Sequence, residues 1–310
     1  TCFSDPKVCD YMYLKTLGSV ICNKTIQNGL TNNQIETTNA NCIVLVVTGY
    51  QKNAYSEEIV YDGENNVSDE ELIDLMNLIK EKGLKVILKP TVNCEDGTWR
   101  AHINFFDEDV PCEPKWSNWF ENYRDFQLHY ATIAQSQECQ LFIAGCEMVM
   151  SEKREDEWRK LITDIKTVFH GLVSYNTDKY QENRVKWWDA VDVISSSGYY
   201  PIDKWEEELD RIEKVIKKYN KPFFFAEIGC MSTSKSMYTP NNWNVTGGVN
   251  LKEQEIWYEK MFLACEKRNW INGFVIWDWK GQQYSLENAK DDGGYDIFNK
   301  PAGEVVRKYF

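Results

Sequence analysis

Short apolar runs alternate with longer amphipathic segments along most of the chain. The apolar runs predict seven strands, at residues 42–47, 85–89, 141–146, 172–175, 191–196, 223–226 and 273–277. Between them, apolar positions recur every three or four residues, which predicts helices over 68–83, 117–137, 155–169, 204–219 and 252–268, with a closing helix from Pro301. Alternating strands and helices are typical of repeated βα units around a parallel sheet.

Local signals mark the ends of several of these elements. Ser68-Asp-Glu-Glu71 is a capping box at the start of one helix, and Gly83 ends that helix. We expect Pro90 to stop the strand that begins at Lys85, because proline has no N–H to give to a neighbouring strand. Pro301 suits the first turn of the closing helix.

We predict an α/β fold, a single (β/α)8 TIM barrel. Such a barrel usually takes about 250 residues plus insertions, which fits the 310 residues of the chain. No linker or internal repeat divides the sequence, so we expect one barrel domain over residues 1–310 with an atypical, cysteine-containing segment at 1–40. The eighth strand is expected in that segment, near residues 11–17. Residues 25–41 are so rich in Asn, Thr and Gly that they predict no clear first helix.

Charge and hydropathy exclude two classes of partner. The formal net charge of −13 would repel phosphate backbones, so we expect no nucleic-acid partner. The longest unbroken apolar run, at 42–47, is far shorter than the roughly 18 residues that would cross a bilayer, so we expect no membrane segment. We expect the protein to act as a monomer.

Cysteine usage and glycosylation sequons favour an oxidising compartment. The ten cysteines are even in number, and none has the C-x-x-C spacing of a zinc or redox site. Three Asn-x-Ser/Thr sequons, at Asn23, Asn66 and Asn244, fall in polar stretches. The chain begins at Thr1 without an apolar leader, so we expect that a signal peptide has been removed and that the protein is secreted and extracellular.

The cysteine pairing stays open at this point. We expect Cys2 to pair with Cys9 and Cys94 with Cys112, because each pair is close in sequence and flanks a polar loop. Cys146 and Cys230 lie in or just after apolar strands, so we expect these two to be free thiols in the interior.

Two glutamates follow apolar strands directly. Glu147 comes after the strand at 141–146, and Glu227 after the strand at 223–226. On a period of two, Glu147 is in phase with residues 141, 143 and 145, and Glu227 with Phe223 and Phe225, so both are expected to face inward. In (β/α)8 barrels the active site lies at the carboxyl ends of the strands. Two carboxyls above one barrel mouth form the pair that glycoside hydrolysis uses. The alternative is that each is a structural acid in a salt bridge.

Aromatic residues accompany these glutamates at other strand ends. Trp277 and Trp279 lie at the end of the last strand, on one expected face, and Tyr199 and Tyr200 follow the strand at 191–196. Sugars have apolar C–H faces that stack on such rings, with a few polar groups to hold their hydroxyls. The alternative for any one of these rings is core packing. The polar loop after the strand at 85–89 offers three more candidates for sugar binding: Asn93, Trp99 and Arg100.

Five ordered segments carry a resemblance to a known family. They are residues 47–51, 88–93 with Trp99-Arg100, 141–148, 222–229 and 294–302. Through them the chain resembles glycoside hydrolase family 113, endo-β-mannanase-like enzymes of a large retaining clan with (β/α)8 barrels, over roughly residues 42–310. The resemblance implies Glu147 as acid/base, Glu227 as nucleophile and Trp277 as the aromatic floor under the sugar at the cleavage point. It also implies hydrolysis of β-1,4-linked mannan-type polysaccharide or oligosaccharide by double displacement, without a cofactor.

The chain departs from the pattern of that clan at two places. Most members carry Asn immediately before the acid/base, where it contacts the sugar 2-hydroxyl, whereas this chain has Cys146. A thiol is a weak donor and acceptor, so we expect Asn93 or Asn176 to make that contact. The first 40 residues do not match the family pattern. Two alternatives therefore stay open: a hydrolase of the same clan acting on another β-glycan or as an exo-β-mannosidase, and a secreted carbohydrate-binding barrel without turnover.

The spacing of the acidic and histidine residues predicts no metal site. An acidic cluster near the C-terminus comprises Asp291, Asp292 and Asp296. Its spacing misses the EF-hand pattern, so we expect a solvated loop. The three histidines are His102, His129 and His170. We expect His129, which lies within an apolar helix face, to be a packing residue with a satisfied side chain.

Overall fold

The computed structural model describes residues 14–21, 38–64, 66–244, 247–279 and 285–310, with the side chains of 14–21 left aside. In these residues, parallel strands close into a barrel in sequence order, and the first pairs with the eighth. The strands are β1 (Leu14–Ile21), β2 (Cys42–Gln51), β3 (Lys85–Cys94), β4 (Leu141–Cys146), β5 (Leu172–Thr177), β6 (Val193–Ser197), β7 (Phe223–Ile228) and β8 (Ile271–Ile276). The predicted (β/α)8 barrel is confirmed.

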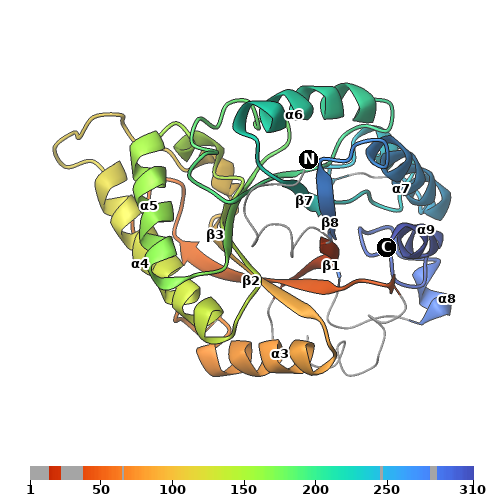
Figure 1. The fold of residues 1–310 in the computed structure, drawn as a ribbon, viewed down its shortest axis with the longest axis horizontal. Helices are drawn as coiled ribbons and strands as arrows, with labels where there is room; N and C mark the ends of the chain where they lie inside the picture. The colour runs from red at the N-terminus through yellow and green to blue at the C-terminus, as the bar shows by residue number, and fades with distance from the viewer. Residues whose placement is uncertain (1–13, 22–37, 65, 245–246, 280–284) are drawn as a thin grey trace.

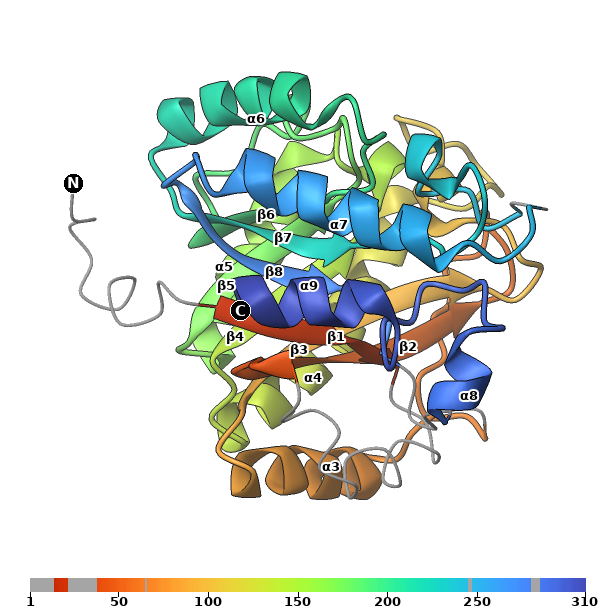
Figure 2. The same cartoon turned by 90° about the vertical axis from the view of Figure 1, so that its right-hand side faces the viewer.

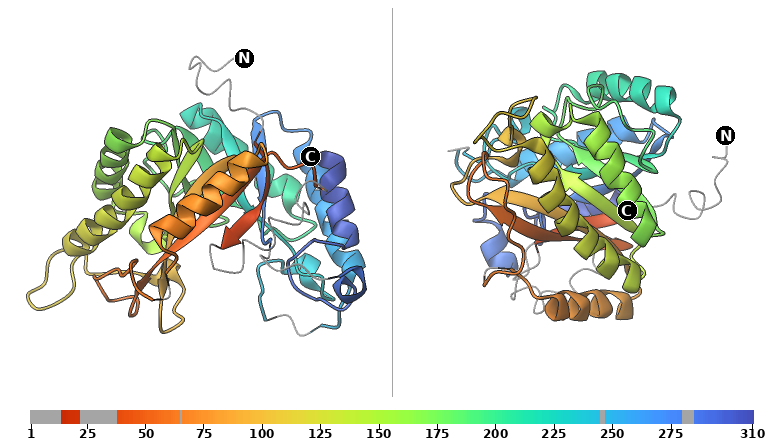
Figure 3. Two further views of the ribbon diagram at one scale, coloured as in Figure 1. Left: turned by 90° about the horizontal axis from the view of Figure 1, so that it is seen from below. Right: turned by 90° about the vertical axis from the view of Figure 1, so that its left-hand side faces the viewer.

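Helices surround the strands in Figure 1. They are α3 (Asp69–Glu81), α4 (Trp116–Ser136), α5 (Glu155–Val168), α6 (Trp205–Tyr219), α7 (Leu251–Cys265), α8 (Leu286–Ala289) and α9 (Pro301–Tyr309). Short 3-10 helices lie at Arg100–His102, Val149–Ser151 and Ser236–Tyr238. Figure 2 shows α9 beside α7, where the rings of Tyr309 and Phe262 stack with centroids 4.7 Å apart. Helices α4 and α5 lie side by side in the left view of Figure 3.

The capping box predicted at the start of α3 is present. The Ser68 hydroxyl accepts a hydrogen bond from the Glu71 backbone N–H at 3.2 Å, and the Glu71 carboxylate accepts one from the Ser68 N–H at 3.0 Å. This satisfies two of the backbone donors that a helix start leaves unpaired. After the helix, Gly83 adopts a φ of +73°, a conformation that glycine takes without a Cβ penalty.

Two apolar layers hold the strands. One lies inside the barrel and takes residues from seven of the strands: Cys42, Val44, Ile87, Leu141, Ile143, Leu172, Val193, Phe224, Ala226 and Val275. The alternate residues pack outward against the helices, as Phe225 does against the ring of Trp205 in α6, with centroids 5.5 Å apart. The strands are thus buried on both faces, which is why they are continuous apolar runs in the sequence.

Several strands have bounds other than those predicted, and β3 and β1 show the reason or the size of the difference. Strand β3 does not stop at Pro90 but runs to Cys94, paired with β2 over its whole length. It pairs with β4 only at Ile87 and Leu88, so Pro90 interrupts no ladder on that side, and a proline is tolerated at an unpaired edge. Strand β1 lies at Leu14–Ile21 instead of near 11–17.

The seven cysteines that the structure describes are all free thiols. Six are buried, and Cys112 is exposed. The predicted disulfide between Cys94 and Cys112 is therefore wrong: Cys94 ends β3 inside the apolar core while Cys112 lies on an exposed turn. The predicted free thiols at Cys146 and Cys230 are confirmed, and the pairing of Cys2 with Cys9 lies outside the described residues. None of the described helices has the length and apolarity of a membrane span.

Candidate active site

A cavity of about 620 Å³ opens at the carboxyl ends of the strands. Its size suits a small-molecule or sugar ligand. Of the nine predicted site residues, six line it: Glu147, Glu227, Trp99, Arg100, Tyr199 and Trp277. The structure thus brings the two glutamates, which are far apart in sequence, to one cavity.

The other three predicted residues lie elsewhere. Asn93 accepts a hydrogen bond from the Arg100 guanidinium at 2.8 Å and so holds Arg100 in place. The fully buried Tyr200 donates to Glu182 Oε1 at 2.6 Å, and Trp279 packs on Phe298 with ring centroids 5.5 Å apart. Tyr200 and Trp279 lie beyond the ends of β6 and β8, at Ser197 and Ile276, where the alternation of a strand no longer decides which way a side chain points.

Glu227 is held by three donors inside the barrel end. Lys89 Nζ lies 2.5 Å from its Oε1, the Cys146 thiol 3.3 Å from the same oxygen, and the Tyr199 hydroxyl donates to Oε2 at 2.9 Å. Burial acts to raise the pKa of Glu227, but the charge and hydrogen bond of Lys89 outweigh it and lower the pKa below its usual value. Burial also raises the pKa of Cys146 well above its usual value, so the thiol is neutral and donates. This arrangement keeps Glu227 ionised.

Glu147 has different surroundings. The Ser197 hydroxyl donates to its Oε1 at 2.7 Å, and the Trp99 indole N–H to its Oε2 at 3.3 Å. Arg100 lies 3.5 Å from the same Oε2. The backbone of Glu147 has a φ of +53°, a left-handed conformation that is unfavourable for a residue with a side chain. Its N–H is bonded to the Asn176 carbonyl at 2.7 Å, which ties this strained residue to β5.

A buried chain of hydrogen bonds joins the two glutamates. Lys89 Nζ donates to Asn176 Oδ1 at 2.7 Å as well as to Glu227. The amide of Asn176 donates to the Ser197 hydroxyl at 3.1 Å, and Ser197 donates to Glu147. Asn176 is fully buried, and neither Asn176 nor Asn93 lines the cavity. One of them was expected to contact the sugar 2-hydroxyl, but neither side chain lies at the cavity surface.

Lys89 and Ser197 were missed in the sequence, although their positions carry a signal. Lys89 lies two residues beyond Ile87, and Ser197 four beyond Val193, so both are in phase with residues of the barrel interior. A polar side chain that continues an inward-facing apolar series must meet other polar groups at the end of the barrel. Asn176 lies four residues beyond the interior residue Leu172 and is in phase with the barrel interior for the same reason.

The alternation of inward-facing and outward-facing residues in β7 also differs from the prediction. Phe223 and Phe225, the residues expected to face inward with it, pack outward, and the interior residues are Phe224 and Ala226. The register between β6 and β7 shifts by one residue between Phe225 and Glu227, and a similar shift precedes Cys146 in β4. A bulge of this kind changes the face of each later residue, and bulges concentrate next to active sites. It therefore turns Glu227 inward.

Asp178, just after β5, also lines the cavity and was not predicted. Its side chain is buried and pairs with Lys179 at 3.4 Å. Burial first, and then the charge of Glu147, raise the pKa of Asp178 to about 7. A second carboxyl near Glu147 thus changes its charge close to neutral pH.

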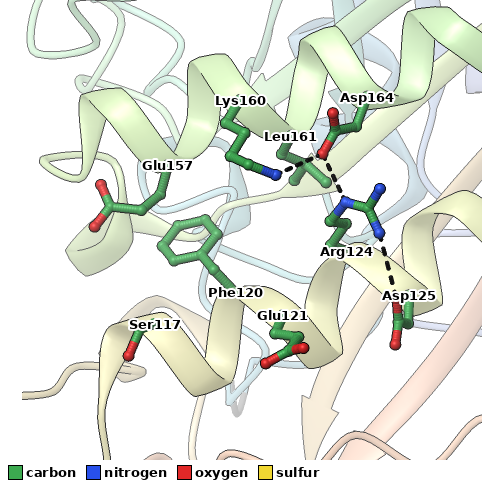
Figure 4. A pocket seen from close by; sticks show the side chains of 9 residues that line it. All are labelled: Ser117, Phe120, Glu121, Arg124, Asp125, Glu157, Lys160, Leu161 and Asp164. Carbon is green, nitrogen blue, oxygen red and sulfur yellow. Dashed lines mark hydrogen bonds and ion pairs between the residues drawn. The ribbon is translucent and has the colours of Figure 1, made fainter.

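A separate hollow lies on the outer face between α4 and α5 (Figure 4). Its volume is about 400 Å³. Three of the charged side chains within it pair with one another: Asp164 accepts from Arg124 at 2.6 Å and from Lys160 at 2.9 Å. Because these charges are already matched, we place the candidate active site at the barrel end.

Two of the three acidic residues near the C-terminus have partners within the protein. Lys300 Nζ lies 2.7 Å from Asp292 Oδ2, and Asp296 accepts from the Phe298 N–H at 2.8 Å. His129 is satisfied by Asp69 at 2.9 Å and contacts the ring of Tyr130, as its expected packing role requires. Among the residues that the structure describes, no three of His, Cys, Asp and Glu are grouped as metal ligands.

Comparisons with known proteins agree with this geometry. The family model described as Glycoside Hydrolase Family 113 matches residues 23–300, so the match begins earlier than the resemblance seen in the sequence. A structure described as a complex of a GH113 β-1,4-mannanase is 47% identical, covers 94% of this chain and 97% of its own, and superposes with a TM-score of 0.91. The GH113 β-mannanase of Alicyclobacillus acidocaldarius is 37% identical, with 96% and 98% coverage and a TM-score of 0.90.

More distant structures share only the barrel. The β-glucuronidase of Ruminococcus gnavus is 14% identical, covers 96% of this chain and 50% of its own, and gives a TM-score of 0.65. A comparison with curated protein sequences gives no match.

Proposed function

Because the chain belongs to glycoside hydrolase family 113, we propose that it is an endo-acting β-1,4-mannanase that retains the anomeric configuration. In this proposal Glu227 is the nucleophile and Glu147 the acid/base. The observation that carries it is the pair of glutamates in one cavity, of which one is held ionised by Lys89 and the other is held by Ser197 and Trp99. The 47% identical structure of a β-1,4-mannanase supports the choice of mannan.

The reaction follows from the surroundings of the two carboxyls. In the first step Glu227 attacks the anomeric carbon and forms a glycosyl ester, while Glu147 gives its proton to the departing glycosidic oxygen. In the second step Glu147 takes a proton from water, the water oxygen attacks the anomeric carbon, and Glu227 leaves as a carboxylate. The lowered pKa of Glu227 suits both its attack and its departure. The rings of Trp277 and Trp99 in the cavity supply apolar faces for the sugar.

Three measurements test this proposal. A 2-deoxy-2-fluoro mannoside with a good leaving group should inactivate the enzyme and label Glu227, as shown by mass spectrometry of the peptide. Glu147→Gln should lower kcat/KM for mannan far more than kcat/KM for an activated aryl mannoside, because in the first step only the poor leaving group needs the proton. NMR of the first product should show retention. Inversion would contradict the double displacement, and inactivity on β-mannans, β-glucans and aryl β-glycosides without labelling would favour a carbohydrate-binding protein.

Secretion and glycosylation stay predictions. The proposed action on a polysaccharide supports them, because a polymer outside the cell is reached by a secreted enzyme. Against them, the described cysteines are free, Asn244 lines the active-site cavity, and the Asn66 amide donates to the Thr48 carbonyl at 2.6 Å. Asn23 lies outside the described residues. The mass of the protein from its native source, before and after enzymatic deglycosylation, tests glycan occupancy.

A further inference from the structure

The backbone that carries Glu147 departs from regular strand geometry. Gly145 has a φ of +140° and Glu147 a φ of +53°, and the register of β4 against β5 shifts between Ile143 and Cys146. A positive φ in a residue with a side chain is unfavourable and persists only where the surrounding structure holds it. The contacts of this turn therefore decide where the Glu147 carboxyl lies.

Strand β5 binds two successive N–H groups of the turn. The Glu147 N–H donates to the Asn176 carbonyl at 2.7 Å, and the Met148 N–H donates to the Tyr175 hydroxyl at 3.0 Å. Met148 is buried, and a buried N–H without a partner is costly. The Tyr175 hydroxyl is thus the side-chain group that stabilises the turn directly after Glu147.

A buried carboxyl orients this hydroxyl. The Tyr175 hydroxyl donates to Glu152 Oε1 at 2.8 Å, and the Thr177 hydroxyl donates to the same oxygen at 2.6 Å. A tyrosine hydroxyl has one proton, so the bond to Glu152 leaves its lone pairs for the Met148 N–H. The Glu152 carbonyl accepts from the Trp187 indole at 3.1 Å, which fixes the segment that carries the carboxyl.

This network lies on the outer side of β5, and none of its hydroxyl and carboxyl groups lines the cavity. The Tyr175 ring packs against Trp158 and Trp187, with centroids 4.8 and 4.9 Å away. Asn176, the next residue, belongs to the hydrogen-bond chain behind the two glutamates. Strand β5 therefore acts on Glu147 in two ways: through that chain on its side chain, and through the outer network on its backbone.

We propose that Tyr175 and Glu152 are positioning residues, which hold the strained turn so that the Glu147 carboxyl can give its proton to the departing glycosidic oxygen. This inference rests on the proposed glycoside hydrolase function and adds to it side chains that touch no substrate. A displacement of about 1 Å in a reacting group can cost about 100-fold in rate. Loss of the network should therefore slow the step that needs the proton more than other steps.

Tyr175→Phe tests this role, because it keeps the ring among the tryptophans and removes only the hydroxyl. We expect kcat/KM to fall by about 10- to 100-fold for mannan, but by less than about threefold for an aryl mannoside with a good leaving group. Across a series of aryl mannosides, kcat/KM should depend more steeply on the leaving-group pKa than in the wild type. Labelling of Glu227 by the 2-fluoro inactivator, which needs no acid, should keep nearly its wild-type rate.

Glu152 offers a second comparison that leaves the tyrosine in place. Glu152→Gln keeps an oxygen that can accept from Tyr175 and should keep the wild-type ratio of kcat/KM for mannan to kcat/KM for the aryl mannoside. Glu152→Met removes the acceptor and should lower this ratio. Tyr200→Phe is the matched control, because Tyr200 is also fully buried and donates to a buried glutamate, Glu182, but follows β6 and packs against Trp205.

Equal losses on mannan and on the aryl mannoside in Tyr175→Phe would overturn this role and indicate a general structural one. A ratio equal to that of Tyr200→Phe would overturn it too. The wild-type enzyme tests the proposed function separately, by its own cleavage of mannan. If it cleaves another β-glycan instead, mannan specificity fails, and the same comparison on that glycan and its aryl glycoside tests the positioning role. If it cleaves no glycoside, the proposed function and the positioning role both fail.

Discussion

Lys89 Nζ lies 2.5 Å from Glu227 Oε1, and the Lys89 side chain is fully buried. Two opposite charges in the interior are costly to desolvate, and each depends on the other for its ionised state. The pair places a permanent cation behind the proposed nucleophile, where it opposes the effect of burial on the Glu227 pKa. Lys89 is therefore the residue on which the charge of Glu227 depends most directly.

Replacement of this cation should move the acidic limit of activity. In Lys89→Met, burial is no longer outweighed, so the Glu227 pKa rises and the acidic limb of the kcat/KM profile shifts to higher pH. We also expect kcat/KM at its optimum to fall by about 100-fold or more, in the range found when one preorganised electrostatic contact is removed. Lys89→Arg, which keeps the charge, is the control. A Lys89→Met enzyme that is folded by circular dichroism and keeps the wild-type acidic limb would contradict this role.

Ser197 should matter most for substrates that need acid catalysis. Its hydroxyl donates to Glu147 Oε1 at 2.7 Å and accepts from Asn176 at 3.1 Å. Hydrogen bonds to charged groups are worth roughly 1.5–3 kcal/mol, so we expect Ser197→Ala to slow mannan hydrolysis by about 10- to 100-fold. Hydrolysis of an aryl mannoside with a good leaving group should slow less, because its departure needs little help from a proton.

Ser196→Ala is the matched control for Ser197→Ala. Ser196 is the preceding residue of β6 and equally buried, but its hydroxyl has no hydrogen-bond partner among the described residues. The same change of size at Ser196 should leave the ratio of the two substrates close to that of the wild type. Equal effects of the two alanine variants on that ratio would rule out positioning of Glu147 by Ser197.

Most of the barrel could be predicted because its strands are buried on both faces. Strand β4 was predicted with its observed bounds, since Leu141–Cys146 is an apolar run between polar segments. The errors in strand bounds arose where pairing with a neighbouring strand, and not local composition, decides how far a strand extends. Pro90 is compatible with β3 only because the pairing of β3 with β4 ends at Leu88, and no local sequence signal reports that.

The site could be predicted only in part, for a similar reason. Glu147 and Glu227 are visible as acids at the ends of apolar strands. The cation at Lys89 and the donor at Ser197 come from other strands, and only the closed barrel brings them to these carboxylates. Tyr200 and Trp279 lie outside the cavity, since residues beyond a strand end do not follow its alternation.

Glu152 should make the protein less stable as the pH rises. This buried carboxyl accepts from the Tyr175 hydroxyl at 2.8 Å and the Thr177 hydroxyl at 2.6 Å, yet burial raises its pKa from 4.5 to about 8. The folded protein thus holds a proton that the unfolded chain loses near pH 4.5. Folding takes up this proton between pH 4.5 and 8, so its contribution to the free energy of unfolding is present at low pH and declines across that window.

Glu152→Gln removes this titration while keeping an oxygen that can accept both hydrogen bonds. We expect the variant and the wild type to have similar Tm values at pH 5, and the variant to be the more stable above pH 8, by at most about 4 kcal/mol. Glu121→Gln, at an exposed position of α4, is the control and should show no such crossover. Thermal unfolding from pH 5 to 9 measures the effect. Parallel Tm profiles for wild type and Glu152→Gln would show that Glu152 does not take up a proton on folding.

The loop after α8 should be held by Lys300 and not by a metal ion. Lys300 is 3% exposed, and its Nζ donates to Asp292 at 2.7 Å, to the Ser232 hydroxyl at 2.7 Å and to the Gly294 carbonyl at 3.3 Å. Its ammonium group therefore lies where a cation bound by the acidic loop would lie. We expect EDTA to leave the Tm unchanged, and Lys300→Met to cost about 3–5 kcal/mol because Asp292 loses this buried ion pair.

The double variant Lys300→Met/Asp292→Asn separates the lost attraction to Lys300 from the cost of a carboxylate that no longer faces this cation. It should recover part of the stability that Lys300→Met loses, because the amide of asparagine needs no counter-ion. A fall in Tm with EDTA that calcium reverses would show that the loop binds a metal and would contradict the role of Lys300.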